Sequence, residues 1–215
     1  MRKYEIRPMT RPLPELVGEV FDPELEEYCE DAPFAPIDSY VWGGEGTYMP
    51  EARAYVTWNE EGLQVLLCAM EKEISVEAPE FNGEVYRDSC LEFFLSAAEC
   101  DARYLNIELN PNLCLYFGFG TGRVDRMRLL LPGGGKTLNA CCERTATGWD
   151  VAYELPFKLL QLFFPDFSPS GKIRGNFYKC GDLTAQEHYL AWNRVDAGHP
   201  DFHLPAYFGE LCFSD

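Results

Sequence analysis

Short stretches that alternate apolar and more polar residues recur after about residue 50, and they constrain the fold more than any other feature. Ala54, Val56 and Trp58 alternate with more polar neighbours, and this period of two residues predicts a half-buried β-strand. Asn59–Gly62 has the composition of a hairpin loop. Leu63–Met70 is nearly all apolar, which predicts a partner strand that is covered on both faces.

Further segments have the length and composition of strands, and clusters of Gly, Pro, Asn or Asp separate most of them. They are Cys90–Leu95, Arg103–Asn110, Asn112–Phe119, Leu138–Glu143, Trp149–Leu155, Ile173–Cys180, His188–Trp192 and Phe208–Phe213. About ten short strands at this spacing predict an all-β fold, namely an antiparallel β-sandwich of the jelly-roll or immunoglobulin-like kind. One short helix is expected over Pro156–Phe163, because its pattern stops before Pro165.

Residues 1–50 differ from the rest because they are rich in proline and acidic residues. Proline fixes φ and removes a backbone donor, so long helices and central strands are disfavoured there. We expect an arm that wraps the domain, with a strand near Tyr4–Arg7 and a short helical turn at Asp22–Leu25. No repeat or internal linker is visible, so residues 1–215 are predicted to form a single domain.

The charge of the chain excludes some partners. It carries 18 basic and 35 acidic residues, a formal net charge of -17. Such a chain should repel a phosphate backbone and an anionic membrane surface, so neither nucleic acid nor a membrane is an expected partner. Met1–Glu5 lacks the apolar segment of a signal peptide, and no stretch of about 18 apolar residues could span a bilayer. A cytoplasmic location is therefore expected.

The nine cysteines agree with that location. Their number is odd, no C-x-x-C zinc pattern occurs, and several, such as Cys68 and Cys114, lie inside apolar runs. Cysteine behaves there as a small hydrophobic residue. The simplest interpretation is a reducing compartment with free thiols.

Familiar catalytic motifs are weak or missing. Gly133–Thr137 ends like a phosphate-binding loop, but Leu130 stands where that motif needs a glycine, so a flexible loop is expected. His199 and His203 have the spacing of a helical zinc pair, but Pro200 argues against a helix. No Gly-x-Ser-x-Gly nucleophile elbow occurs. Two alternatives stay open: an enzyme such as a glycosidase with paired carboxylates, and a scaffold that binds protein partners.

The strand Tyr104–Asn110 is the most informative for function. Leu105, Ile107 and Leu109 share one face. The other face carries Tyr104, Asn106, Glu108 and Asn110. An aromatic ring beside amide and carboxylate groups suits a sugar, because the ring stacks on C–H surfaces while the polar groups bond hydroxyls. The alternative is an ordinary solvent-facing strand surface.

Several blocks in a fixed order resemble carbohydrate-binding module family 9, from about Ala52 to the C-terminus. The matching blocks are Ala54–Val65, Asp88–Phe94, Asp150–Phe157, Gly175–Asp182 followed by Trp192, and Pro205–Leu211. The resemblance implies a DOMON-like β-sandwich that holds a sugar end between two aromatic rings without cleaving it. It also implies a link to carbohydrate catabolism and calcium ions in structural roles.

The resemblance also implies which residues bind the saccharide. Tyr86 and Phe202 stand where the family has its two clamp tryptophans, and Glu92 matches the carboxylate of the second block. The remaining candidates by position are Asn106, Glu108, Lys179, Asp182, Trp192 and His203. The arginine of the family has no clear counterpart in this chain.

The segment Asn193–Tyr207 lacks strand periodicity and is long for a loop. Loops of this length in a compact domain are usually functional. We predict that it folds over the face that carries Asn106 and Glu108, and that it places Phe202 or His203 near Glu92 and Tyr86. The alternative is that Phe202 is buried core and the loop closes one end of the domain.

Overall fold

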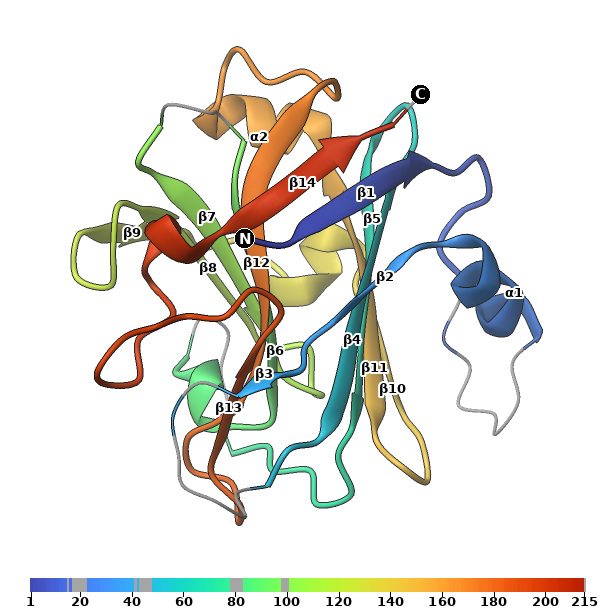
Figure 1. Ribbon diagram of the computed structural model, residues 1–215. Coiled ribbons are helices and arrows are strands. Elements are labelled where there is room, and N and C mark those ends of the chain that lie inside the picture. The colour runs from blue at the N-terminus through green and yellow to red at the C-terminus, as the bar shows by residue number, and fades with distance from the viewer. Residues whose placement is uncertain are drawn as a thin grey trace.

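The computed structural model describes residues 1–14, 16, 23–40, 42, 48–77, 83–97 and 101–214, and most of the ordered elements are strands (Figure 1). The strands are β1 Lys3–Pro8, β2 Phe34–Pro36, β3 Ser39–Tyr40, β4 Glu51–Trp58, β5 Gly62–Met70, β6 Cys90–Ser96, β7 Tyr104–Leu109, β8 Leu115–Gly120, β9 Arg126–Arg128, β10 Cys141–Arg144, β11 Trp149–Pro156, β12 Lys172–Gly181, β13 His188–Ala191 and β14 Gly209–Phe213. The helices are α1 Pro23–Asp31 and α2 Phe157–Phe163, with 3-10 helices over Val85–Arg87, Gly134–Leu138 and Pro205–Tyr207.

The predominantly β class is confirmed, and α2 lies within the segment predicted as a helix. The helical turn expected at Asp22–Leu25 is longer than predicted, because α1 extends over Pro23–Asp31 and makes a second helix. Pro23 opens it, which suits the missing N–H of proline at a first helical position. Asp22, the expected cap, lies outside the described residues.

The strands join into one curled, mixed sheet in the order β10-β11-β5-β4-β1-β14-β12-β6-β7-β8-β9, with β13 beside β12 and β2 beside β4. The prediction of a purely antiparallel fold is wrong at β1, which runs parallel to both β14 and β4. Parallel neighbours need a connection longer than a hairpin turn. The long proline-rich arm between β1 and β4 provides that connection.

The curl lets residues from both halves of the sheet share one hydrophobic core. Val56 and Val65 enter it from one half, and Phe93 and Phe177 from the other, with their two ring centroids 4.8 Å apart. The apolar face of β7 points into this core, as its periodicity predicted. Its polar face is also buried, because a second cluster that includes Tyr178 covers it.

The proline-rich arm is fastened to the sheet. The predicted strand near Tyr4–Arg7 is present as β1. The buried Tyr4 hydroxyl donates to the Pro33 carbonyl at 2.5 Å and accepts the Val56 N–H at 2.8 Å. One side chain therefore ties the arm to itself and to β4.

The glycine-rich segment after Pro132 forms a 3-10 helix over Gly134–Leu138 in place of a flexible loop. Gly133 and Gly134 have φ values of 93° and 59°, a conformation that glycine adopts without strain. This turn delays the following strand, so β10 begins at Cys141 and not at Leu138.

The described cysteines carry free thiols, which agrees with the interpretation made from the sequence. Cys100 lies outside the described residues. The described helices include none with the length and hydropathy needed to cross a bilayer.

Candidate functional site

A pocket of about 310 Å³ lies on the polar side of β6, β7 and β12, beneath the loop that joins β13 to β14. Its lining brings together residues from the arm, a 3-10 helix, five strands and three loops: Trp42, Tyr86, Glu92, Glu108, Arg123, Val124, Arg126, Arg128, Cys180, Asp182, Tyr189, Pro200, Asp201, Phe202 and His203. Of the nine residues predicted from the sequence, six line this pocket: Tyr86, Glu92, Glu108, Asp182, Phe202 and His203.

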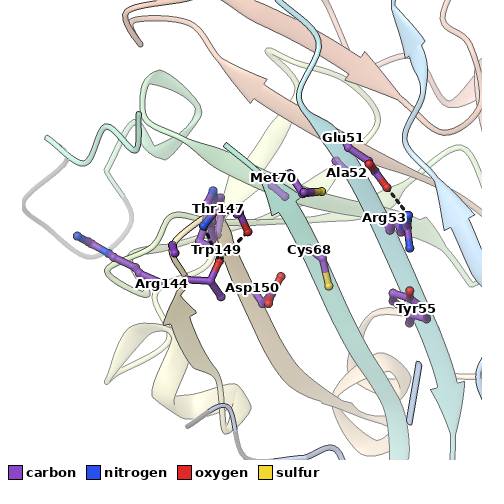
Figure 2. Close-up of a pocket in the computed structure, with 13 residues that line it drawn as sticks. Glu51, Ala52, Arg53, Tyr55, Cys68, Met70, Arg144, Thr147, Trp149 and Asp150 are labelled. Carbon is purple, nitrogen blue, oxygen red and sulfur yellow. Dashed lines mark hydrogen bonds and ion pairs between the residues drawn. The ribbon is translucent and has the colours of Figure 1, made fainter. Parts of the chain in front are cut away.

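A second pocket of about 420 Å³ lies over β4, β5 and β11 on the other half of the sheet (Figure 2). Arg53 at its edge forms an ion pair with Glu51. None of the nine predicted residues lines it. We therefore regard the pocket beneath the β13–β14 loop as the candidate site, although it is the smaller of the two.

Two glutamates form its floor. Glu92 on β6 pairs in register with Glu108 on β7, and each is only 2% exposed. Asn106 Nδ2 donates to Glu108 Oε1 at 2.6 Å, and Cys180 Sγ donates to Glu92 Oε1 at 3.0 Å. Asn106 therefore supports the floor from below and does not line the pocket. Glu108 Oε2 is buried and has no hydrogen-bond partner among the described residues.

Burial changes the protonation of this floor. Desolvation raises the pKa of Glu108 to about 7, although Arg126 and the Asn106 hydrogen bond oppose the shift. Desolvation, followed by the charge of Glu108, also raises the pKa of Glu92 well above its usual value. Burial and then Arg126 lower the pKa of His203 far below its usual range. Near neutral pH the floor therefore offers protonated carboxyls as well as acceptors, next to a neutral imidazole.

Aromatic rings form one wall of the pocket. The ring centroids of Trp42 and Phe202 are 5.3 Å apart, and those of Trp42 and Tyr189 are 5.7 Å apart. Phe202 stacks on Tyr178 with a centroid distance of 4.1 Å. Trp42 and Tyr189 were not predicted from the sequence. The signal available for Trp42 was a large aromatic residue beside two glycines in a loop-like segment.

The β13–β14 loop lies where it was expected. Tyr178 Oη donates to the Phe202 carbonyl at 3.2 Å, and the Tyr104 hydroxyl is 2.8 Å from His203 Nδ1. These contacts fasten the loop over β7 and β12, so Phe202 and His203 share the pocket with Glu92. Phe202 is 8% exposed, which makes it both a lining residue and a member of the second hydrophobic cluster.

Lys179 and Trp192 do not reach this pocket. Lys179 lies on the opposite face of β12, where its Nζ is 3.0 Å from Glu71 Oε2 and 2.8 Å from His188 Nε2. Trp192 packs in the main core against Tyr4 and Phe177. Both side chains are buried, so the structure gives them a place in the interior and no access to a ligand in the pocket.

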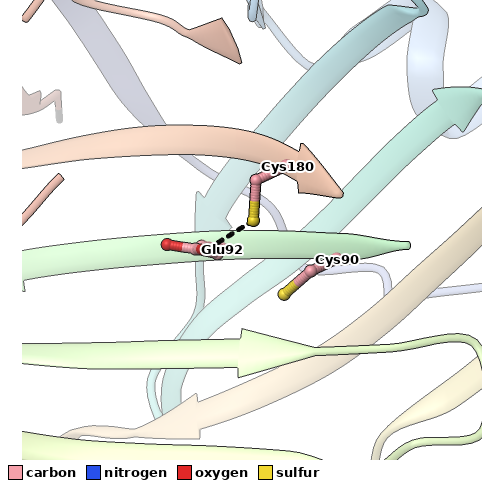
Figure 3. A group of neighbouring side chains, drawn as sticks. All are labelled: Cys90, Glu92 and Cys180. Atoms are coloured by element: carbon pink, nitrogen blue, oxygen red, sulfur yellow. Dashed lines mark hydrogen bonds between the residues drawn. The ribbon is translucent and has the colours of Figure 1, made fainter. Parts of the chain in front are cut away.

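Cys90, Glu92 and Cys180 form a buried group whose potential ligand atoms all lie within 4.8 Å of one another (Figure 3). Calcium prefers oxygen ligands, so two thiols and one carboxylate do not suit it. The structural calcium implied by the resemblance stays a prediction, and this group does not provide its site.

Comparison with known proteins decides the family. The family model described as carbohydrate-binding family 9 matches residues 23–213. The chain belongs to carbohydrate-binding family 9. This family 9 protein is accordingly a non-catalytic carbohydrate-binding protein, and the glycosidase alternative is set aside. No curated protein matched the sequence.

Solved structures share the fold of this family 9 protein. A candidate carbohydrate-binding protein from Bacteroides uniformis is 27% identical with a TM-score of 0.77, over 99% of both chains. A family 9 module from Caldicellulosiruptor kristjanssonii in complex with cellotriose is 13% identical with a TM-score of 0.64, over 99% of this chain and 93% of that one. The glucose complex of a family 9 module from the same organism is 14% identical with a TM-score of 0.63, over 99% of this chain and 96% of that one.

A glycine on β8 packs against the residue that supports the floor of the candidate pocket. Asn106 pairs in register with Gly118, and a Cβ at Gly118 would lie 2.1 Å from Asn106 Oδ1. We expect Gly118→Ala to displace Asn106 from Glu108 and to weaken saccharide affinity by about tenfold, the value of one hydrogen bond. Calorimetric titration with a saccharide that the wild type binds measures the change.

Gly122→Ala is the matched control for this substitution, because a Cβ at Gly122 meets nothing within 4 Å. Its affinity should equal that of the wild type. Equal affinities for the two alanine variants would show that the packing of Asn106 against Gly118 does not position Glu108.

Proposed function

We propose that the protein binds the end of a mono- or oligosaccharide in the pocket beneath the β13–β14 loop. The observation that carries the proposal is Glu108 Oε2, a buried acceptor on a residue that lines the pocket, without a partner among the described residues. Buried polar atoms in native proteins are almost always hydrogen-bonded. A sugar hydroxyl would supply the missing donor.

The aromatic wall supports the same proposal. Trp42, Tyr86 and Phe202 border the pocket that Glu92 and Glu108 floor. Rings stack on the apolar C–H faces of a pyranose, while fixed polar groups select its hydroxyls. In this proposal Tyr86 and Phe202 stack on the sugar, as the family resemblance implied, and Trp42 adds a ring from the arm. Asp182 and His203 provide further polar contacts.

The proposal extends to the type of sandwich, the cellular location and the biological role of the protein. Residues 1–215 would form one DOMON-like sandwich of the jelly-roll kind, supported by the core that both halves of the sheet share. Free thiols among the described cysteines support a reducing, cytoplasmic setting. A role in carbohydrate catabolism, with no nucleic acid or membrane partner, completes the proposal.

Calorimetry with glucose, galactose, xylose and cellotriose tests the proposal. A single open pocket of this kind should bind with a Kd between micromolar and millimolar, about -8 to -4 kcal/mol. Absence of heat with every saccharide at near-millimolar protein would contradict it.

Glu108→Gln tests the floor directly. The substitution keeps an oxygen for Asn106 but replaces the free acceptor with an amide N–H, which cannot accept from a hydroxyl. At a pH above about 7, where Glu108 is mainly ionised, we expect affinity to fall by about tenfold to a hundredfold, the range for a hydrogen bond to a charged group. Glu143→Gln is the control, because Glu143 Oε1 is likewise buried without a partner among the described residues but lies outside the pocket. Equal losses of affinity in the two variants would show that Glu108 does not bind the saccharide.

A further inference from the structure

Three arginines line one side of the candidate pocket. Arg126 and Arg128 lie on β9, and Arg123 lies in the turn between β8 and β9. None of them was predicted from the sequence, although three arginines within six residues stand out in a chain with 35 acidic residues. They concentrate positive charge at one place on an acidic protein.

Neutral groups hold these arginines. The guanidinium carbons of Arg126 and Arg128 lie 4.9 Å and 4.8 Å from the centroid of the same Tyr116 ring. Arg128 Nε donates to Tyr116 Oη at 3.0 Å, and Arg126 Nη1 contacts His203 Nδ1 at 2.7 Å. Arg123 Nη1 donates to the Pro200 carbonyl at 3.3 Å. Ring faces and a carbonyl fix the positions of the guanidinium groups but do not neutralise them.

Most other arginines of the protein are paired with acidic groups, and the exceptions among the described residues are Arg144, Arg174 and Arg194. Six arginines lie within 4.0 Å of a carboxylate: Arg2, Arg7, Arg11, Arg53, Arg87 and Arg103. Among the described residues, no carboxylate comes that close to Arg123, Arg126 or Arg128. Two guanidinium groups on one ring repel each other, and a bound anion would relieve that repulsion.

The carboxyl groups of the pocket act on these arginines through space, Glu108 on Arg126 and Arg128, and Asp182 on Arg123. Among the described residues none of them comes within 4.0 Å of a guanidinium group. Glu92 and Glu108 are 2% exposed and form the floor, whereas Arg123 and Arg128 are exposed and Arg126 is half-buried. Asp201 Oδ1 accepts the backbone N–H of His203. The two glutamates therefore lie at the buried floor, and the guanidinium groups lie nearer the mouth of the pocket. The floor suits the hydroxyls of a ligand, and the mouth suits an anion.

We propose that the preferred ligand is an anionic sugar, whose carboxylate or phosphate is held by Arg123, Arg126 and Arg128 while its ring hydroxyls meet Glu92 and Glu108. This inference rests on the proposed function, because it places a sugar in the same pocket. Guanidinium groups bind carboxylate and phosphate oxygens in paired, charge-assisted hydrogen bonds. An uncharged sugar would leave all three groups without an anionic oxygen in hydrogen-bonding contact among the described residues.

The test compares sugars that share a ring and differ at C6, where one has a neutral hydroxymethyl group and its partner has an anion. Glucose and glucuronate, galactose and galacturonate, and glucose 6-phosphate are titrated into the full chain by calorimetry. We expect an acidic sugar to bind at least about tenfold more tightly than its neutral partner, with the advantage shrinking in concentrated NaCl. The comparison between glucuronate and glucose 6-phosphate identifies which anion the arginines prefer.

Arginine variants connect that preference to the pocket. Arg126→Gln and Arg128→Gln should each reduce the ratio of acidic to neutral affinity by about tenfold. Arg53→Gln removes the same charge from a surface ion pair on β4 and should leave the ratio unchanged.

Two outcomes separate this inference from the proposed function. If neutral sugars bind and their acidic partners bind no more tightly, the anionic-ligand inference is overturned and saccharide binding stands. If neither kind binds, both are overturned. Equal ratios in the wild type and both β9 variants would also refute the role of these arginines.

Discussion

Replacing Lys179 with methionine is expected to lower the free energy of unfolding by about 3–5 kcal/mol, the usual cost of removing one partner of a buried ion pair. Lys179 and Glu71 are 0% and 2% exposed, and their charged atoms are 3.0 Å apart. Methionine fills the space of the lysine stem but leaves Glu71 with only Trp149 Nε1, at 3.0 Å, and His188 nearby. Urea denaturation of the two proteins measures the difference.

A double-mutant cycle gives this prediction its control. Glu71→Gln in the Lys179→Met background removes the uncompensated carboxylate, so the double variant should be more stable than the sum of the single losses predicts. Arg53→Gln breaks an exposed pair with Glu51 and should cost no more than about 1 kcal/mol. A Lys179→Met protein as stable as Arg53→Gln would mean that the buried pair contributes little.

Replacing Trp42 with alanine is expected to weaken saccharide affinity by about 30-fold or more, a loss of about 2 kcal/mol that is typical of a central aromatic contact. Trp42 is half-buried, packs against Phe202 and Tyr189, and donates its Nε1–H to the Ala197 carbonyl at 2.8 Å. It belongs to the arm and is not part of the main core. Calorimetry and thermal unfolding of the same preparation measure binding and stability together.

Two other aromatic substitutions make the interpretation of Trp42→Ala specific. Trp58 is also half-buried but packs against Phe157 and Phe213, away from the pocket. Trp58→Ala should therefore lower stability and leave affinity unchanged. Phe202→Ala should reduce both, because Phe202 is nearly buried on Tyr178 and a core Phe→Ala change costs about 3–5 kcal/mol. If Trp42→Ala bound saccharide like the wild type, the arm would not be part of the site.

Much of the fold follows from local patterns. Alternation of period two places β4, β6, β7, β11 and β12 close to where the structure has them, because side chains on a strand point alternately to its two faces. β9 and the short strands of the arm were missed, since three residues or fewer carry no detectable period. The parallel pairing of β1 joins the two ends of the chain, and no local pattern reports it.

The same alternation indicates that Lys179 is buried, although a charged side chain is usually expected at the surface. Lys179 shares a strand face with Ile173 and Phe177, which both lie in the main core. Period two therefore places Lys179 inside, opposite to Tyr178 and Cys180. A charged residue on a core face is rare unless it is paired, and Glu71, its partner, lies more than one hundred residues away in the sequence.

By itself the sequence determined the longer strands, the predominantly β class, the family and the choice of Glu92 and Glu108 as candidates for the site. These depend on spacing within a strand or on blocks that keep their order along the chain. Only the tertiary structure decided what covers those glutamates. Trp42 packs against Phe202, and Tyr104 contacts His203 across 99 residues of sequence. Arg126 and Arg128 lie over one tyrosine ring, and Arg123 lines the same pocket. Contacts between residues far apart in the sequence depend on how the sheet curls and where the loops cross it. Hydrophobic periodicity is a local pattern and predicts neither.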